Sequence, residues 1–311
     1  MPLAAAPERP VKFKHQVIYH CARGLMALLQ ALPYEKVGRL GLLFGSVVFA
    51  LSEREAAKTL RNLKTAYGDD LTSAERLRLA RRVWRNFGRN IFEAVHWLRW
   101  TTERIRSQVA VVYGEEELKA AFARGKGVFV VSAHLGNWEL LASHVSGLGP
   151  TSGLAQNLYD PRFDSLVTDF RVKNLGLVQM IKRGFALRGI LEALGQGHFM
   201  MALVDQDTGK DGVFVPFYGK MAWTQSGVAR IAQRTGASLV PAFMVRGRDG
   251  RYEMHVEKAI LVPAEGDKEK NVLEAVTDLT RTIEKYVREY PDQWVWMHDR
   301  WKTRPDDENK V

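Results

Sequence analysis

The spacing of hydrophobic positions changes near residue 105 of this chain. Before it, apolar residues recur every three or four positions, as in Glu53–Tyr67, and this period predicts amphipathic helices. After it, short apolar runs alternate with helical segments. The runs Gly127–Ser132 and Phe199–Val204 show no polar alternation, so we expect strands buried on both faces. The alternation predicts an α/β fold with a mostly parallel central sheet covered by helices.

The other expected elements follow from the same two periods. Thr72 and Glu75 form a capping-box pattern, which predicts that a second amphipathic helix begins there. Further strands are expected at Ser152–Gln156, Leu177–Ile181, Ser238–Val245, Tyr252–Val256 and Ala259–Val262, the last two as an antiparallel extension. Further helices are expected at Glu139–Gly147, Asp160–Asn174, Ala186–Leu194, Thr224–Arg234 and Asn271–Tyr290.

Two apolar stretches precede these elements, Val17–Leu32 and Leu40–Leu51. Polar residues interrupt the first, and the second has only twelve residues, whereas a spanning helix needs about 20. We therefore expect a helical segment that associates with a membrane, either as a monotopic anchor or as a weak single span. In a span, three basic residues would stay on the cytoplasmic side: Arg9, Lys12 and Lys14. Two ordinary buried helices are the alternative.

The patterns divide the chain into three parts. Residues 1–52 form the hydrophobic membrane-associating helices, and residues 53–305 form the α/β domain, in which residues 53–100 are a basic helical subregion. Residues 306–311 are a polar tail.

The net charge is concentrated in the first third of the chain. The whole sequence has 45 Lys+Arg and 35 Asp+Glu, and residues 1–100 alone contain 17 and 8 of these. Six arginines lie within Arg76–Arg89. Such a segment suits a polyanion, whether nucleic acid, anionic lipid or an acidic carrier protein. The single cysteine, Cys21, excludes an internal disulfide and a cysteine-based zinc site.

The strongest chemical signal directly follows the first buried strand. His134 and Glu139 are five residues apart, which on a continuous helix would separate them by about 140°. They meet only if the intervening Gly136-Asn137 forms a turn. The Glu139 carboxylate would then accept the imidazole N–H and raise the basicity of the ring, as in a general base. The alternative is a capped strand–helix junction with a structural histidine.

Three further segments carry weaker signals. Asp205 and Asp207 follow a buried strand, where a D-x-D pattern occurs in metal-dependent glycosyltransferases but also in turns. The stretch Phe214–Lys220, before a helix N-cap expected at Thr224, suits an apolar channel or plain core. Gln293–Pro305 mixes aromatic and basic residues, which suits a membrane interface, a phosphate-bearing headgroup or an aromatic plug on the sheet. Two arginines are candidates for anion binding or for simple surface positions: Arg162 and Arg171.

Taken together and in this order, the motifs resemble those of the bacterial lipid A late acyltransferases, the lauroyl/myristoyl group related to the phosphatidylinositol-mannoside acyltransferases. The matching residues are HLGNWE at 134–139, Arg171, DQDTG at 205–209, VFVPFYG at 213–219, Gly236 before VPAF at 240–243, and WMHDRWKTRP at 296–305. The likeness extends over about residues 15–305. One departure is Asp299, where relatives often carry a basic residue.

The resemblance implies an O-acyltransferase of lipid A and lipopolysaccharide biosynthesis at the cytoplasmic face of the bacterial inner membrane. It would move a fatty acyl chain from an acyl carrier protein or coenzyme A thioester to a hydroxyl of a membrane glycolipid, such as a lipid A precursor. Anionic inner-membrane lipids are further expected partners, and nucleic acid is not. A thioester is already activated, so the reaction needs no metal or cofactor.

The resemblance also suggests roles for individual residues. His134 would be the general base and Glu139 its partner, with Arg171 and Asp207 in the same catalytic site. Contacts to substrate are expected from Asn137, Arg162, Asp205, Arg300 and Lys302. Two alternatives stay open: a metal-dependent D-x-D glycosyltransferase acting on a lipid acceptor, and a non-catalytic basic protein that binds membranes.

Overall fold

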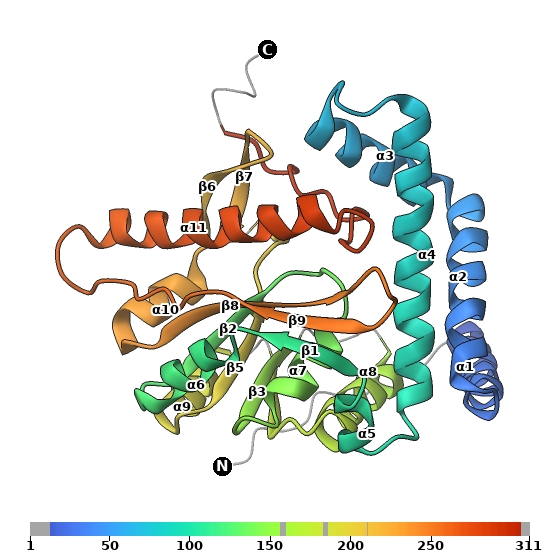
Figure 1. The fold of residues 1–311 in the computed structure, drawn as a ribbon, viewed down its shortest axis with the longest axis horizontal. Coiled ribbons are helices and arrows are strands. Elements are labelled where there is room, and N and C mark those ends of the chain that lie inside the picture. Colours follow the sequence, from blue (N-terminus) through green and yellow to red (C-terminus); the bar gives the residue numbers. More distant parts are fainter. Residues whose placement is uncertain (1–12, 156–159, 183–185, 210, 306–311) are drawn as a thin grey trace.

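The computed structural model describes residues 13–155, 160–182, 186–209 and 211–305. Arg9, Lys12 and the tail at 306–311 therefore lie outside the described residues, as does the side chain of Lys14. Within the described part, seven strands form one sheet in the order β1-β9-β8-β2-β5-β3-β4, and β6 and β7 form a separate antiparallel hairpin (Figure 1). The bounds of the strands are β1 Val109–Tyr113, β2 Val128–Ser132, β3 Thr151–Ala155, β4 Gln179–Lys182, β5 Phe199–Leu203, β6 Gly212–Phe217, β7 Lys220–Gln225, β8 Ser238–Arg246 and β9 Tyr252–Val256.

Every neighbouring pair in the sheet is parallel except β8 and β9. The predicted α/β class and the antiparallel strand at Tyr252–Val256 are thus confirmed. The segment predicted as a strand at Ala259–Val262 makes only an isolated bridge, between Ile260 and Leu239. The helices are α1 Phe13–Ala31, α2 Tyr34–Leu51, α3 Glu53–Tyr67, α4 Ser73–Trp97, α5 Thr102–Arg106, α6 Glu115–Ala123, α7 Trp138–Val145, α8 Pro161–Asp169, α9 Ala186–Gly195, α10 Gly227–Thr235 and α11 Lys268–Glu289, with a π-helix at Phe170–Asn174.

The two faces of the sheet bury different sets of helices. In β2 all five residues are buried, as expected for a strand covered on both sides. Phe129 and Val131 belong to the core cluster that includes α9, α10 and α11. Val128 and Val130 belong to the cluster that includes α6 and α7. Because helices cover both faces, the carboxyl end of β2 is held firmly in place.

The segment around Phe214–Lys220 differs from the sequence expectation. It forms the β6–β7 hairpin, whose two-residue turn has positive φ at Tyr218 and Gly219, as hairpin turns of this length require. Thr224 is therefore a strand residue, and the next helix begins at Gly227 after Ser226. The hairpin contributes Val215 and Phe217 to the core and does not line the pocket described below.

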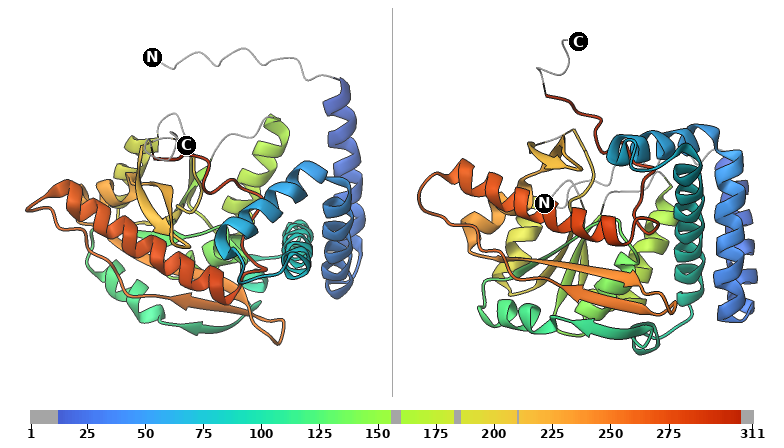
Figure 2. Two further views of the ribbon diagram at one scale, coloured as in Figure 1. Left: turned by 90° about the horizontal axis from the view of Figure 1, so that it is seen from above. Right: turned by 45° about the horizontal axis from the view of Figure 1, so that its top comes forward.

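The N-terminal helices form an extra layer beside the sheet. Helix α4 stands between the sheet and the pair α1 and α2, an arrangement that all views in Figures 1 and 2 share. Thr72 and Glu75 form the predicted capping box at the start of α4. Glycines bring α2 and α4 unusually close together: a Cβ on Gly45 would lie 2.0 Å from the Trp84 carbonyl oxygen, and one on Gly88 would lie 2.4 Å from the Gly41 carbonyl oxygen.

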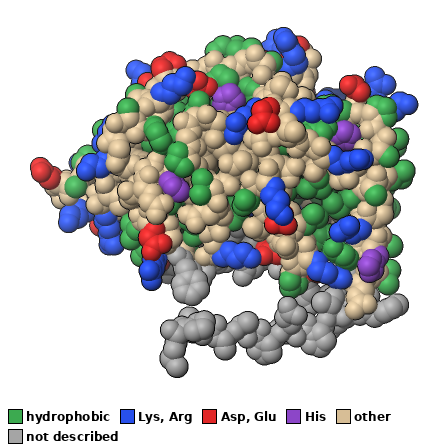
Figure 3. Space-filling view, turned by 90° about the horizontal axis from the view of Figure 1, so that it is seen from below, with side chains coloured by type: hydrophobic (Ala, Val, Ile, Leu, Met, Phe, Trp, Pro, Cys, Tyr) green, Lys and Arg blue, Asp and Glu red, His purple; other side chains and the backbone are tan. Residues whose placement is uncertain are grey.

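The outer side of this layer is apolar. Exposed leucine, phenylalanine and valine side chains follow one stripe of α2: Leu40, Leu43, Phe44, Val47 and Leu51. Exposed apolar side chains of α1 continue this surface: Val17, Leu25 and Leu28. Figure 3 shows green side chains gathered on this edge of the molecule, with Lys and Arg among them. Among the described residues, no helix has both the length and the apolar character needed to cross a bilayer.

Candidate active site

The site begins at the carboxyl ends of two neighbouring strands. Strands β2 and β5 pair in parallel, with Ser132 opposite Leu203. Two residues beyond the end of each strand, the loops that follow carry His134 after β2 and Asp205 after β5. In open α/β sheets this edge is the usual place for ligands, because the loops that leave the strands meet there.

His134 is paired with Asp205. The imidazole Nδ1 lies 2.8 Å from Asp205 Oδ1, and the backbone N–H of His134 donates to Asp205 Oδ2 over 3.0 Å. The indole N–H of Trp294 also donates to Oδ2, over 2.8 Å. Because a carboxylate can only accept, the neutral ring carries its proton on Nδ1 and has a free lone pair on Nε2.

Burial and charge act in opposite directions on this pair. Burial lowers the pKa of His134, but the charge and hydrogen bond of the Asp205 carboxylate outweigh it, so the pKa lies above its usual value. Burial raises the pKa of Asp205, and the His134 ring and the donors around the carboxylate bring it below the usual value. The geometry thus favours an ionised Asp205 that orients His134 and makes it a stronger base.

Glu139 has a different partner from the predicted one. Its carboxylate accepts two hydrogen bonds from Arg171 Nε, at 3.0 and 3.2 Å, and one from a terminal nitrogen of Arg171 at 2.5 Å. The expected hydrogen bond between Glu139 and His134 is therefore wrong. The predicted turn at Gly136-Asn137 does form, but Glu139 enters α7 facing the π-helix that carries Arg171. Glu139 still raises the pKa of His134 through its charge.

Arg171 lies on a π-helix, which positions its side chain beside Glu139. The predicted helix at Asp160–Asn174 begins with Asp160 as its N-cap and changes from α to π geometry at Phe170. Such wide turns are rare and occur frequently at functional sites. Arg171 and Glu139 are both largely buried, with side-chain exposures of 23% and 19%. The pair is therefore a fixed dipole beside His134.

Asp207 lies near the site but serves the fold. One carboxylate oxygen accepts from the Thr303 backbone N–H over 2.7 Å, and the other accepts from Gly209 N–H and from the Thr303 hydroxyl. The acid that pairs with His134 is therefore Asp205, which the resemblance assigns to substrate contact, and not Asp207, which it assigns to the catalytic site. The two acids have separate partners, and the described residues contain no group of three or more His, Cys, Asp or Glu that could hold a metal ion.

The residues expected to contact substrate are spread over several places. Asn137 is buried, caps α7 by accepting from Leu140 N–H, and donates to the hydroxyl of Tyr252. Arg162 binds Asp160 and stacks on the ring of Tyr19, 4.1 Å from its centroid.

The C-terminal aromatic and basic segment is a plug on the core, not a membrane surface. Three of its tryptophans are buried: Trp294, Trp296 and Trp301. Arg300 is only 1% exposed, and it donates to the Trp223 carbonyl and the Thr224 hydroxyl. Burial lowers the pKa of Arg300 to about 10. This enclosure contradicts the expected headgroup contact of Arg300, while Lys302 is exposed.

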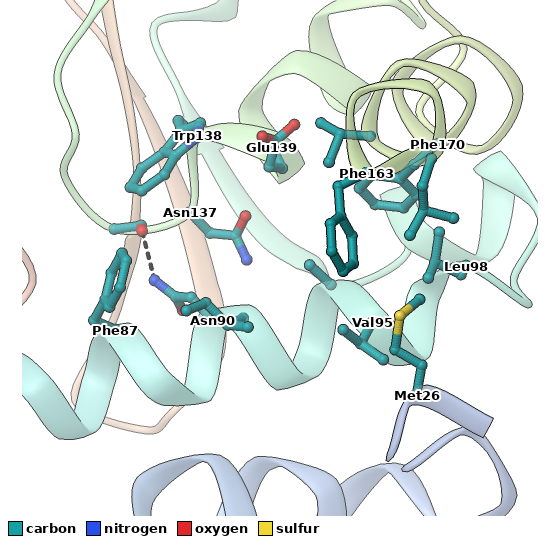
Figure 4. Close-up of a pocket in the computed structure, with 15 residues that line it drawn as sticks. Met26, Phe87, Asn90, Val95, Leu98, Asn137, Trp138, Glu139, Phe163 and Phe170 are labelled. Atoms are coloured by element: carbon teal, nitrogen blue, oxygen red, sulfur yellow. Dashed lines mark hydrogen bonds between the residues drawn. The ribbon is translucent and has the colours of Figure 1, made fainter. Parts of the chain in front are cut away.

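An apolar pocket of about 340 Å³ opens beside Glu139. Its walls come from α1, α4, the start of α7, α8 and the π-helix (Figure 4). Phe87 lies at the end near Trp138, whereas Met26 and Leu98 lie toward α1 (Figure 4). His134 does not line the pocket, but its ring makes an edge-to-face contact with Trp138, whose centroid is 5.2 Å away. The sequence motifs predict Asn137 and Glu139 at this site but not the apolar walls of the pocket, which come from segments far apart in the chain.

Comparison with known proteins identifies the class of enzyme to which this site belongs. Residues 7–303 match the family described as bacterial lipid A biosynthesis acyltransferase. The lipid A biosynthesis lauroyltransferase of Escherichia coli (strain K12) is 28% identical over 288 residues, covering 91% of this chain and 90% of the relative. The palmitoleoyltransferase of the same organism is 28% identical over 296 residues, covering 93% and 92%. A phosphatidylinositol mannoside acyltransferase of Mycolicibacterium smegmatis is 25% identical over 282 residues, covering 85% and 87%.

The match extends over nearly the whole chain, and the chain belongs to the bacterial lipid A biosynthesis acyltransferase family. It is an enzyme of the O-acyltransferase type. This assignment confirms the resemblance seen in the sequence and sets aside both the glycosyltransferase and the non-catalytic alternatives.

Proposed function

We propose that this enzyme transfers a fatty acyl chain from a thioester of acyl carrier protein or coenzyme A to a hydroxyl of a membrane glycolipid, a lipid A precursor. The observation that carries the proposal is the His134–Asp205 pair next to an apolar pocket. Such a pocket suits an acyl chain because most of its lining side chains are apolar; the polar ones are Asn90, Asn137 and Glu139.

The proposed chemistry needs one proton shuttle. His134 Nε2 takes the proton of the acceptor hydroxyl while its oxygen attacks the thioester carbonyl carbon. The tetrahedral intermediate then collapses, the C–S bond breaks, and the leaving thiolate receives the proton from His134. Asp205 holds the His134 ring in the tautomer that these reaction steps require. General-base catalysis of this kind accelerates a reaction by about 10²–10⁴-fold.

The negative charge of the intermediate needs a donor. The backbone N–H of Gly136 donates to the Gln293 carbonyl, and that of Asn137 donates to the Met244 carbonyl, so the fold already uses both. Arg171, held by Glu139 at the edge of the pocket, is a fixed positive group beside the reaction centre. In this proposal Arg171 stabilises the negative charge that develops on the thioester carbonyl oxygen.

The N-terminal layer would hold the enzyme at its substrate. The apolar stripe of α2 and the exposed residues of α1 form a surface suited to the acyl boundary of a bilayer, next to the exposed cations Lys36 and Arg39. We place this surface on the cytoplasmic face of the inner membrane, with anionic lipids as its partners. The exposed arginines of α4 would attract the acidic carrier protein: Arg78, Arg81, Arg82 and Arg85.

The test is an acyl-transfer assay with a purified lipid A precursor and read-out by mass spectrometry, run once with acyl carrier protein and once with coenzyme A as donor. We expect His134→Ala to lose at least about 10²-fold in kcat with either donor. The control is His144→Ala, because His144 also pairs with a carboxylate, Glu115 at 2.9 Å, away from the β2–β5 edge. Wild-type turnover by His134→Ala would rule out the proposed base.

A further inference from the structure

A buried polar network connects the N-terminal helical layer to the turn between His134 and Glu139. Its centre is Glu93 of α4, which is 1% exposed. One carboxylate oxygen of Glu93 accepts from Arg89 Nε over 2.8 Å. The other accepts from Arg246 over 2.6 Å and from the Tyr252 hydroxyl over 2.7 Å.

The network reaches the turn at two points. The side-chain amide of Asn137 donates to the Tyr252 hydroxyl over 2.9 Å. One residue earlier, the carbonyl oxygen of Gly136 accepts from the side-chain amide of Asn90 over 2.7 Å, the bond drawn in Figure 4. Both residues of the turn are thus tied to α4, one directly and one through Tyr252.

The turn has little freedom of its own. Gly136 has φ +59°, and a Cβ there would lie 1.9 Å from the Met244 carbonyl oxygen. The chain must therefore pass very close to β8 before it enters α7. The hydrogen bonds to α4 hold this segment in addition. This matters because a misplacement of reacting groups by about 1 Å can lower the rate about 10²-fold.

The cost of burying these groups argues that the network has a use. A buried carboxylate is retained without a large penalty only when it is paired and hydrogen-bonded, and apolar residues of similar volume are often as stable. The network contacts the turn through Asn137. It also reaches the contact between α4 and α2, where a Cβ on Gly38 would lie 3.3 Å from Arg89 Nε.

We infer that Tyr252, Glu93 and Asn90 are positioning residues for the acyl-transfer reaction: Tyr252 and Glu93 act through Asn137, and Asn90 acts directly, to hold the His134–Glu139 turn against α4. This inference rests on the proposed role of that turn in catalysis. It also makes the N-terminal layer part of the catalytic scaffold, in addition to its contact with the membrane.

The test compares two tyrosine variants. Tyr252→Phe loses a buried hydroxyl that donates to Glu93, and Tyr286→Phe is the matched control because its hydroxyl donates to Glu257 over 2.8 Å, away from the turn. We expect urea unfolding to show a loss of stability in both variants, larger in Tyr252→Phe because its hydroxyl has more buried partners. Only Tyr252→Phe should lose about 10-fold or more in kcat, with KM for either substrate within about twofold of wild type. Equal kcat in the two variants would overturn the inference.

A second variant shows whether the effect passes through Asn137. Asn137→Ser keeps an N-cap for α7 but loses the amide that contacts Tyr252. If Tyr252 acts through Asn137, the double variant should have the kcat of Asn137→Ser alone, whereas multiplied losses would contradict that route. If Tyr252→Phe does not fold, Asn90→Ala tests the direct tie and should lower kcat by a similar factor; unchanged kcat there would overturn the inference.

The pH profile separates this inference from the proposed base. Neither Tyr252→Phe nor Asn90→Ala touches the His134–Asp205 pair, so the acid limb of kcat/KM should stay at its wild-type pH. Activity retained by His134→Ala in the same assay would contradict the proposed function, whatever the tyrosine variants show.

Discussion

Asp205 occupies the place beside His134 that the sequence assigned to Glu139. The two carboxylates then have different tasks. Asp205 is buried and contacts the ring directly, so it sets the tautomer and the basicity of His134. Glu139 is turned toward Arg171 and fixes a positive group at the edge of the pocket. A histidine that is hydrogen-bonded to one carboxylate and has an ion pair nearby is well placed to act as a base.

This division of tasks makes Asp205→Asn a sharp test at the scale of one residue. An asparagine keeps the shape but removes the charge that raises the pKa of His134, and it can donate to Nδ1 and impose the wrong tautomer. Because the proposed base must be neutral, we expect activity to fall as the pH drops through the pKa of His134. We expect kcat to fall by at least about 10²-fold and the acid limb of the remaining kcat/KM to move to lower pH. An acid limb that stays in place would show that Asp205 does not set this pKa.

The sequence predicted the position of the site better than its contacts. His134 and the acids at 205 and 207 follow strands that were recognisable as buried, so their meeting at one sheet edge could be expected. The choice between Asp205 and Asp207 depended on strand register, because Ser132 opposite Leu203 places His134 level with Asp205. The pairing of Glu139 depended on a π-turn that brings Arg171 to it, and no pattern of residues predicts such a turn.

At the scale of elements, segments with one strong period were predicted well. The helix at Glu53–Tyr67 and the capping box at Thr72 match the structure, since local propensity and packing agree there. The hairpin at 212–225 was missed because its aromatic and apolar residues suit several environments and its turn places Tyr218 at positive φ. The network around Glu93 had no sequence signal, because its members come together only through the contact of α4 with β8 and β9.

The close contact of α2 and α4 is the element-level feature with the clearest mutational test. A Cβ on Gly45 would lie 2.0 Å from the Trp84 carbonyl, so Gly45→Ala must push the two helices apart. We expect a loss of about 1–3 kcal/mol in the free energy of unfolding, measured with urea. Gly24→Ala in α1 is the control, since nothing lies within 4 Å of the added Cβ. There the better helix propensity of alanine should stabilise the protein by up to about 1 kcal/mol.

Failure of Gly45→Ala to destabilise would mean that α2 and α4 adjust without loss. In that case contact with α2 would not fix the position of α4. The packing of α4 on the sheet would then hold Glu93 in place.

At the scale of the whole molecule, the layers follow one another from an apolar outer surface to the sheet edge that carries His134. The apolar surface of α1 and α2 is outermost, α4 lies behind it with the pocket along its inner side, and the sheet edge with His134 comes next. A substrate that stays in the bilayer would then reach the base without leaving the membrane surface. The wall of the pocket formed by Met26 of α1 makes the outer layer part of the path that an acyl chain would follow.

This arrangement predicts that the outer leucines of α2 drive membrane binding. Leu43 and Leu51 are 61% and 78% exposed, so replacing both with glutamate should leave the fold intact. Burying a leucine side chain in an apolar phase contributes about 1.5–3 kcal/mol, so we expect the double variant to bind anionic vesicles at least about tenfold more weakly in a sedimentation assay. Leu273→Glu on α11, which replaces an exposed leucine away from this layer, should bind like wild type.

Since the proposed membrane contact brings the acceptor to the site, the double variant should also lose activity on a vesicle-embedded precursor while it keeps activity on the same lipid in detergent. Equal vesicle binding by the double variant and by Leu273→Glu would exclude this surface as the attachment site.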